Sequence, residues 1–180
     1  MSNNITDNID HGTTLQEINA ADASRFAVLL GGIYEHSPWV AARAHARRPF
    51  ATPDAVHAAM TAVVMAASRA EQLALIRAHP ELAGREAIAG VMTVDSTGEQ
   101  GRLGLTALPP AEFARISALN QQYQRKFGFP CIVALKLHAT RETVLDEMER
   151  RINNDIETEI ANALAQIGHI TRGRLDKLVR

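Results

Sequence analysis

Cysteine is nearly absent from this chain of 180 residues, since Cys131 is the only one. A single thiol cannot form an internal disulfide, which is typical of proteins from a reducing compartment. Apolar runs long enough to cross a membrane are also missing. Residues 1–12 carry no basic-then-apolar signal pattern, and the last three residues are not a peroxisomal signal. We therefore expect a cytoplasmic protein that makes no membrane contact.

Motifs for metal, nucleotide and nucleic-acid binding are missing as well. The seven histidines form no His-Glu-x-x-His pattern and there is no cysteine pair, so no metal site is expected. The glycines match neither a Walker loop nor a dinucleotide fingerprint. A net charge of −1 gives no basic field for nucleic acid. The basic cluster of Arg43, His45, Arg47 and Arg48 is typical of a solvated helix face, with a phosphate or partner contact as the weaker alternative.

What the chain does contain is a succession of helix signals. Apolar residues make up 46% of a sequence long enough for one domain with a real core. Thr14 and Ser68 each begin a capping box, and Thr52 precedes a proline at a first helical position. A long helix is predicted from Pro110, and Gly128 is expected to end it.

The last fifty residues decide the fold class. Residues 131–137 are apolar and partly β-branched, which fits a strand or a buried irregular segment. Beyond them, Ile156, Ile160 and Ile167 mark one face of a helical region, with Gly168 as a candidate bend. Because no second strand-like run occurs, we predict an all-α, single-domain bundle of about seven to nine helices. It would extend over residues 13–180, after a flexible tail at 1–12.

The stretch from Arg77 to Gln100 concentrates groups that could carry chemistry. Pro80 disfavours helical backbone angles at the residue before it, so a helix should end at His79. A histidine titrates near neutral pH and can move protons, although one that only interacts with a helix dipole is the commoner case. Ser96 and Glu99 have capping-box spacing, which predicts a helix that begins at Ser96 and attracts anions.

The roles of several neighbouring residues stay open from sequence alone. Glu99 could orient His79, bind N–H groups of a ligand, or only favour its helix. Ser96 is a cap or a ligand contact, and without a Gly-x-Ser-x-Gly elbow it is not expected to be a nucleophile. The string from Lys126 to Pro130 either packs a helix end or forms the floor of a pocket for a flat polar ring. Apolar surroundings favour an inert thiol at Cys131.

A combination of separate stretches carries a resemblance to a known family. The stretches are Ala78-His79-Pro80-Glu81-Leu82-Ala83-Gly84, Ser96-Thr97-Gly98-Glu99-Gln100, Leu119-Asn120, Tyr123, Lys126 to Pro130 and Arg174-Leu175. In this order, over residues 15–180, they resemble the OHCU decarboxylases, the ureidoimidazoline decarboxylases of urate breakdown. Any single stretch would be weak, and the combination is specific.

The resemblance implies an all-helical homodimer that converts 2-oxo-4-hydroxy-4-carboxy-5-ureidoimidazoline to (S)-allantoin and CO2 without a cofactor. It places the catalytic histidine on His79. The substrate contacts that it implies are Pro80, Ser96, Thr97, Gly98, Glu99, Gln100, Cys131, Ile132, Val133, Ala134, Leu135 and Arg174, with Arg172 close to the last. Two departures from the family pattern concern Cys131, where phenylalanine is usual, and Gly173, where a larger apolar residue is common.

A mechanism follows as a hypothesis. The substrate carries its own electron sink in a C=N bond, so the protein has to position it and move a proton. We expect His79 to contact the substrate hydroxyl and later donate a proton, and Glu99 to hold ureido N–H groups and fix the imidazole. Arg174 would hold a negative group. The alternatives are a cofactor-free ureide amidohydrolase that activates water, and a non-catalytic helical interaction module.

Overall fold

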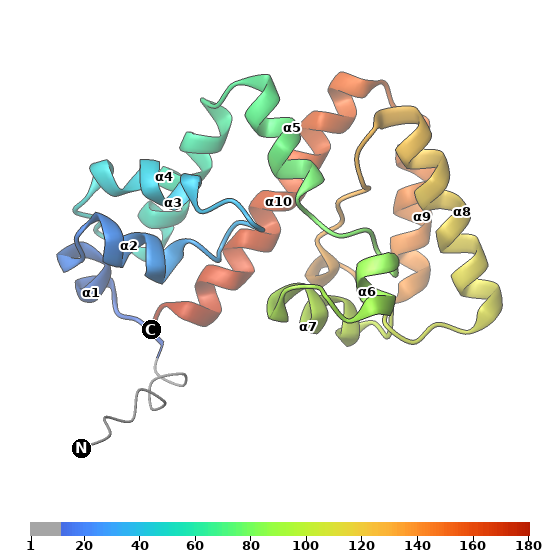
Figure 1. Cartoon of the computed structure of the whole chain (residues 1–180), viewed down its shortest axis with the longest axis horizontal. Helices are drawn as coiled ribbons and strands as arrows, with labels where there is room; N and C mark the ends of the chain where they lie inside the picture. Colours follow the sequence, from blue (N-terminus) through green and yellow to red (C-terminus); the bar gives the residue numbers. More distant parts are fainter. Residues whose placement is uncertain (1–11) are drawn as a thin grey trace, which may run out of the picture.

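The computed structural model describes residues 12–180, so the predicted tail lies outside the described residues except for Gly12. The described chain forms ten α-helices and two 3₁₀ helices (Figure 1). They are α1 (Leu15–Ala20), α2 (Ala23–Leu30), α3 (Trp39–Ala44), η1 (His45–Arg47), α4 (Pro53–Met65), α5 (Arg69–Arg77), α6 (Arg85–Ala89), α7 (Val94–Arg102), α8 (Pro110–Phe127), η2 (Leu135–Leu137), α9 (Arg141–Arg151) and α10 (Ile156–Leu178).

The all-α prediction is confirmed. Residues 12–180 contain no β-strand, only an isolated bridge between Thr13 and Val179. The described chain has one α-helix more than the nine at the top of the predicted range. Three of the ten, α1, α3 and α6, span only five or six residues each. No single helix of the described chain is long and apolar enough to cross a bilayer. Only α4 and α5 together, across a 116° bend, reach that length and composition.

Local capping chemistry sets most helix ends as predicted. Thr14 and Ser68 form capping boxes, in which each hydroxyl accepts the N–H of the glutamate three residues later and that glutamate accepts the cap N–H. Thr52 caps α4. Gly128 ends α8 with φ of +73°, a left-handed conformation that glycine adopts without steric cost.

Helix α7 differs from the prediction. It begins at Val94 with Thr93 as its cap, and the Thr93 hydroxyl accepts the N–H of Ser96 at 3.3 Å. Ser96 therefore lies inside the first turn, and the helix start expected at Ser96 is wrong. The expected bend at Gly168 is also wrong, because α10 continues through it.

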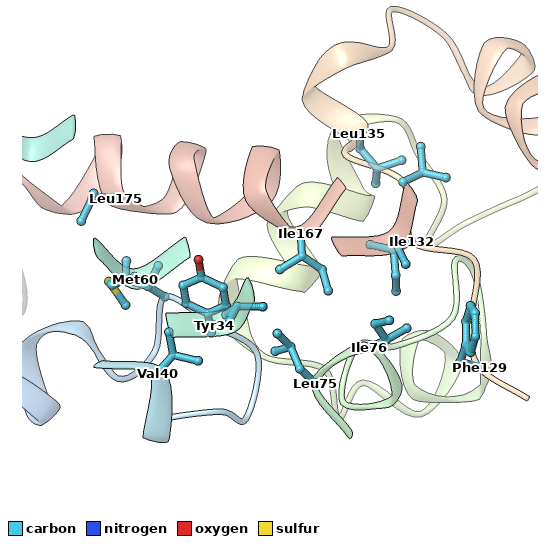
Figure 2. Close-up of a cluster of buried hydrophobic side chains, with 14 of the residues drawn as sticks. Tyr34, Val40, Met60, Leu75, Ile76, Phe129, Ile132, Leu135, Ile167 and Leu175 are labelled. Atoms are coloured by element: carbon cyan, nitrogen blue, oxygen red, sulfur yellow. The ribbon is translucent and has the colours of Figure 1, made fainter. Parts of the chain in front are cut away.

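Helix α10 organises the arrangement of the others. Figure 1 shows it running between a group formed by α1 to α4 and a group formed by α6 to α9. It contacts α4, α5 and η2. Its buried side chains Ile167 and Leu175 meet Leu75 and Ile76 of α5 and Met60 of α4 in a continuous core (Figure 2). Any group carried on the inner face of α10 can therefore reach both halves of the molecule.

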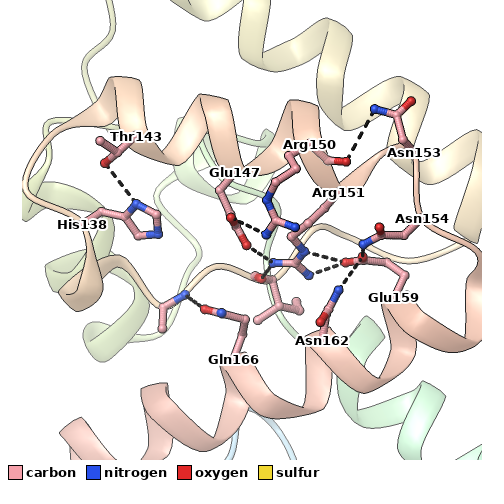
Figure 3. Close-up of polar contacts among 12 residues, drawn as sticks. His138, Thr143, Glu147, Arg150, Arg151, Asn153, Asn154, Glu159, Asn162 and Gln166 are labelled. Carbon is pink, nitrogen blue, oxygen red and sulfur yellow. Dashed lines mark hydrogen bonds and ion pairs between the residues drawn. The ribbon is translucent and has the colours of Figure 1, made fainter.

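Residues 131–137 form an irregular segment that ends in η2, not a strand, and the segment is buried from Cys131 to Leu135. Side chains from three helices satisfy its backbone. Arg151 of α9 donates to the Ile132 carbonyl at 2.7 Å, and Arg102 of α7 donates to the Leu135 carbonyl. The Ala134 N–H donates to Oε1 of Gln166 on α10 at 2.7 Å, a contact drawn in Figure 3. Buried backbone groups need such partners, so these contacts replace the ladder of a sheet.

A buried ionic network lies behind this segment. Arg151 and Glu159 are both 0% exposed and form an ion pair, with Nε of Arg151 2.8 Å from Oε1 of Glu159 (Figure 3). Tyr123, Asn154 and Asn162 donate further hydrogen bonds to the same carboxylate. The network joins α8, α9 and α10, and through the Ile132 carbonyl it also fixes the irregular segment.

The string from Lys126 to Pro130 packs a helix end. Phe127 lies between Tyr123, at 4.7 Å between ring centroids, and Phe129, at 5.8 Å. All three rings are buried in the core. The basic cluster is likewise engaged in the fold, because Arg43 pairs with Glu71 and Arg48 donates to backbone carbonyls.

Candidate active site

A pocket lies where the end of α5, helix α7, the irregular segment and α10 meet. Its empty volume, counted up to the open mouth, is about 390 Å³. Its lining residues are His79, Pro80, Leu82, Ser96, Glu99, Gln100, Cys131, Ile132, Val133, Leu135, Ile170 and Arg174. Ten of the thirteen residues implied by the resemblance thus surround one cavity.

Three of those residues lie elsewhere. Thr97 and Gly98 are on the exposed face of α7. Ala134 is 0% exposed and does not line the pocket, and its N–H is bound by Gln166. Of the two neighbouring arginines, Arg174 lines the pocket, whereas Arg172 pairs with acidic side chains outside it.

His79 lies just beyond the last turn of α5, as the proline after it predicts. Its Nδ1 is 3.0 Å from the Leu75 carbonyl, and a carbonyl only accepts, so Nδ1 carries the proton. Nε2 is buried and has no hydrogen-bond partner among the described residues. Burial lowers the pKa of His79 to about 4, against the Leu75 hydrogen bond and the charge of Glu35, which raise it. The imidazole is therefore neutral near pH 7, with a free lone pair on Nε2.

The Leu75 carbonyl, and not Glu99, orients this imidazole. Glu99 instead forms a two-point ion pair with Arg174, with Nε to Oε1 and Nη2 to Oε2 both at 3.0 Å. The expectation that Glu99 fixes the imidazole is corrected on this point. A two-point contact holds a carboxylate in a defined plane, so Glu99 is placed rigidly at the wall of the pocket.

A second carboxylate, Glu35, completes the cluster and was missed by the sequence analysis. It lies between α2 and α3 and is 2% exposed. Its Oε2 accepts from Nη1 of Arg174 at 2.8 Å and from the Ser96 hydroxyl at 3.0 Å, and its Oε1 accepts from the Thr93 hydroxyl at 2.7 Å. Burial would raise the pKa of Glu35, but the Thr93 hydrogen bond and the Arg174 charge outweigh it and lower that pKa. Next to it, His36 adopts a φ of +44°, which is rare for a non-glycine residue.

Gln100 supports the wall beside His79. Its Oε1 accepts the Ala83 N–H at 2.8 Å, and its Nε2 donates to the Glu81 carbonyl at 3.2 Å. Ala83 has a φ of +48°, so this side chain holds a strained turn in place. Both ends of the amide are committed to the protein, and its role in the described chain is to shape the pocket.

The model of the OHCU decarboxylase family matches residues 19–176. The chain belongs to the OHCU decarboxylase family. It is 40% identical over 165 residues to a 2-oxo-4-hydroxy-4-carboxy-5-ureidoimidazoline decarboxylase of Halalkalicoccus jeotgali, which covers 92% of this chain and 91% of that protein.

Longer proteins contain the same unit. A uric acid degradation bifunctional protein of Bacillus subtilis is 37% identical over 166 residues, which cover 92% of this chain and 33% of that protein. The crystal structure of an (S)-allantoin synthase superposes with a TM-score of 0.71 at 31% identity, over 93% of this chain. This chain spans about half of that structure, 54% of its length.

For a member of the OHCU decarboxylase family, the pocket offers one proton carrier, His79, and no activated nucleophile. Burial raises the pKa of the Cys131 thiol to about 12, so it stays protonated and unreactive. Ser96 donates its single proton to Glu35, and the lowered pKa of Glu35 makes that carboxylate a weak base for activating the hydroxyl. Residues 12–180 contain no group of three or more His, Cys, Asp or Glu side chains that could hold a metal.

Proposed function

We propose that this chain decarboxylates 2-oxo-4-hydroxy-4-carboxy-5-ureidoimidazoline to (S)-allantoin and CO2 without a cofactor, as a step of urate breakdown. The observation that carries the proposal is the unpartnered, buried Nε2 of His79 in a pocket that also contains the Glu99–Arg174 pair. Family membership and the names of the relatives support the same reaction class.

The chemistry needs little beyond positioning and proton transfer. The carbon that carries the carboxylate also carries a hydroxyl, and a C=N bond lies beside it. When the C–C bond to the carboxylate breaks, CO2 leaves and the electron pair forms a carbon–carbon double bond, while the C=N pair moves to nitrogen, which takes a proton. The hydroxyl then loses its proton, and the adjacent carbon gains one to give the carbonyl product. Overall, one proton is taken up for each CO2 released.

His79 suits the two proton transfers between oxygen and carbon. As a neutral imidazole with its proton on Nδ1, it can accept the hydroxyl proton at Nε2. The imidazolium so formed is a strong acid, because burial depresses its pKa to about 4. It would therefore return the proton readily to the carbon on the face where it lies, which is how one enantiomer of the product would arise.

The other pocket groups would bind and orient. Glu99 can accept from the ureido N–H groups while Arg174 holds it in place. The segment of Ile132, Val133 and Leu135 presents backbone and apolar surface to a flat ring, and its hydrogen bonds to three helices keep it rigid. Such fixed placement lowers the entropic cost of reaching the reactive geometry.

The test generates the unstable substrate in place from urate with the two preceding enzymes, and follows optically active allantoin by circular dichroism. The protein should speed its appearance over spontaneous decay, with or without a chelator. His79→Asn keeps a donor for the Leu75 carbonyl but removes Nε2, and should lower kcat by about a hundred- to ten-thousand-fold. His138→Asn is the matched control, because the imidazole of His138 is bonded to Thr143 outside the pocket.

Three outcomes would reject the proposal. Formation of allantoin no faster than without the protein would favour a non-catalytic helical module. Ammonia released in place of CO2 would favour the amidohydrolase alternative. Full turnover in His79→Asn would reject the role of His79. The homodimer implied by the resemblance and the cytoplasmic location expected from composition are also proposals, for light scattering and cell fractionation to test.

A further inference from the structure

Arg174 forms ion pairs with two carboxylates, although a single carboxylate would balance its charge. Glu99 takes Nε and Nη2, and Glu35 takes Nη1. Arg174 is 4% exposed and Glu35 is 2% exposed. One positive and two negative groups give this cluster of three side chains a net charge of −1 when all three are ionised.

The hydrogen bonds of the Arg174 guanidinium use nearly all of its donors. An arginine has five N–H donors in a fixed fork. Nε binds Glu99, Nη2 binds both Glu99 and the Ser96 hydroxyl, and Nη1 binds Glu35. One Nη1 hydrogen is left, so Arg174 has no free edge with two parallel donors for a further carboxylate.

An uncommitted guanidinium beside a decarboxylation site would work against the reaction. Arginine binds carboxylates strongly through two parallel hydrogen bonds. That contact would stabilise the substrate carboxylate in the ground state, and it would weaken as the charge leaves the carboxyl group. Interactions stronger in the ground state than in the transition state slow catalysis.

We infer that Glu35 is a positioning residue that holds Arg174 onto Glu99 and keeps its positive charge away from the carboxylate of the substrate. The inference rests on the proposed decarboxylation. It also accounts for the built surroundings of Glu35, since the Thr93 and Ser96 hydroxyls at the start of α7 both donate to it. Glu35 does not line the pocket, so its ion pair with Arg174 is the route by which it reaches the carboxylate of a bound ligand.

The test compares two ring ligands, neutral hydantoin and anionic hydantoin-5-acetate, by calorimetry on the wild type and on Glu35→Gln. Glutamine keeps the shape of the side chain and removes its charge. The variant should bind hydantoin-5-acetate about tenfold more tightly relative to hydantoin than the wild type does. Its kcat should fall while KM stays level or falls, the pattern of lost ground-state discrimination. Damage to the fold alone would raise KM and weaken both ligands.

Asp54→Asn is the matched control, because Asp54 pairs with Arg172 of the same helix outside the pocket. It removes the same charge and should leave the ligand ratio unchanged. Glu35→Asp, which keeps the charge on a shorter side chain, should lie between wild type and Glu35→Gln, and it serves as the test variant if Glu35→Gln does not fold. An unchanged ratio in the Glu35 variants, or an equal shift in Asp54→Asn, would overturn the inference. The binding comparison needs no turnover, so it stands apart from the allantoin assay that tests the proposed function.

Discussion

Replacing His79 by asparagine should make the stability of the fold less sensitive to mild acid. Burial lowers the pKa of this imidazole from 6.5 to about 4 in the folded protein. Between these values the unfolded chain binds a proton that the folded chain does not, so the free energy of unfolding falls as the pH falls through this window. From pH 6.5 to pH 4, at about 1.36 kcal/mol for each unit of pH, the free energy of unfolding falls by about 3 kcal/mol from this single group.

The measurement is urea unfolding at several pH values from 7.5 down to 4.5. Wild type and His79→Asn should differ in the slope of unfolding free energy against pH, with the wild type falling more steeply. Carboxylates away from the pocket contribute equally to both curves, so the difference between the curves reports chiefly His79. His169→Asn, on the exposed face of α10, controls for the loss of one histidine. Parallel curves for wild type and His79→Asn would refute the claim that His79 is held neutral by burial.

Three further outcomes follow from the same contacts. The acid limb of kcat/KM should titrate near pH 4 and not near 6.5 if His79 begins as a base, which a pH–rate profile would show. Arg151→Met should lower stability by about 3–5 kcal/mol in urea unfolding, because it leaves Glu159 buried without its cation, and adding Glu159→Leu should recover much of that loss; equal stability of single and double variants would contradict this. Cys131 should resist iodoacetamide in the folded protein and react only on unfolding, as mass spectrometry can follow.

The parts of the fold that sequence predicted are those with local causes. A capping box such as that of Ser68 involves residues three positions apart, so the chain carries the whole signal. The start of α7 could not be decided in this way, because Thr93 and Ser96 are both good caps. A distant contact decides it. Both hydroxyls donate to Glu35, but the Ser96 hydroxyl also accepts from Arg174, seventy-eight positions away, whereas the Thr93 hydroxyl accepts the N–H of Ser96 and caps the helix.

In the candidate site too, features with a local sequence signal were predicted, and features that depend on distant contacts were not. His79 was predicted from the proline that follows it, and its place at a helix end is what the structure has. Its orientation by the Leu75 carbonyl could not be predicted, because any nearby acceptor would satisfy the ring. Glu35 follows only two apolar residues, Ile33 and Tyr34, so the sequence gives no clear sign that its carboxylate is buried and needs a cation. The sequence does not say that the cation is Arg174, 139 positions further on.

The irregular wall of the pocket has a consequence for how the molecule forms. Residues 131–134 have no regular structure of their own, and together with Leu135 at the start of η2 they are held by Arg102, Arg151 and Gln166, which come from α7, α9 and α10. Until those three helices have docked, nothing gives this wall its shape. Ligand recognition is thus an outcome of completed assembly, and a chain interrupted within its last third would lose the cavity before it lost most of its helices.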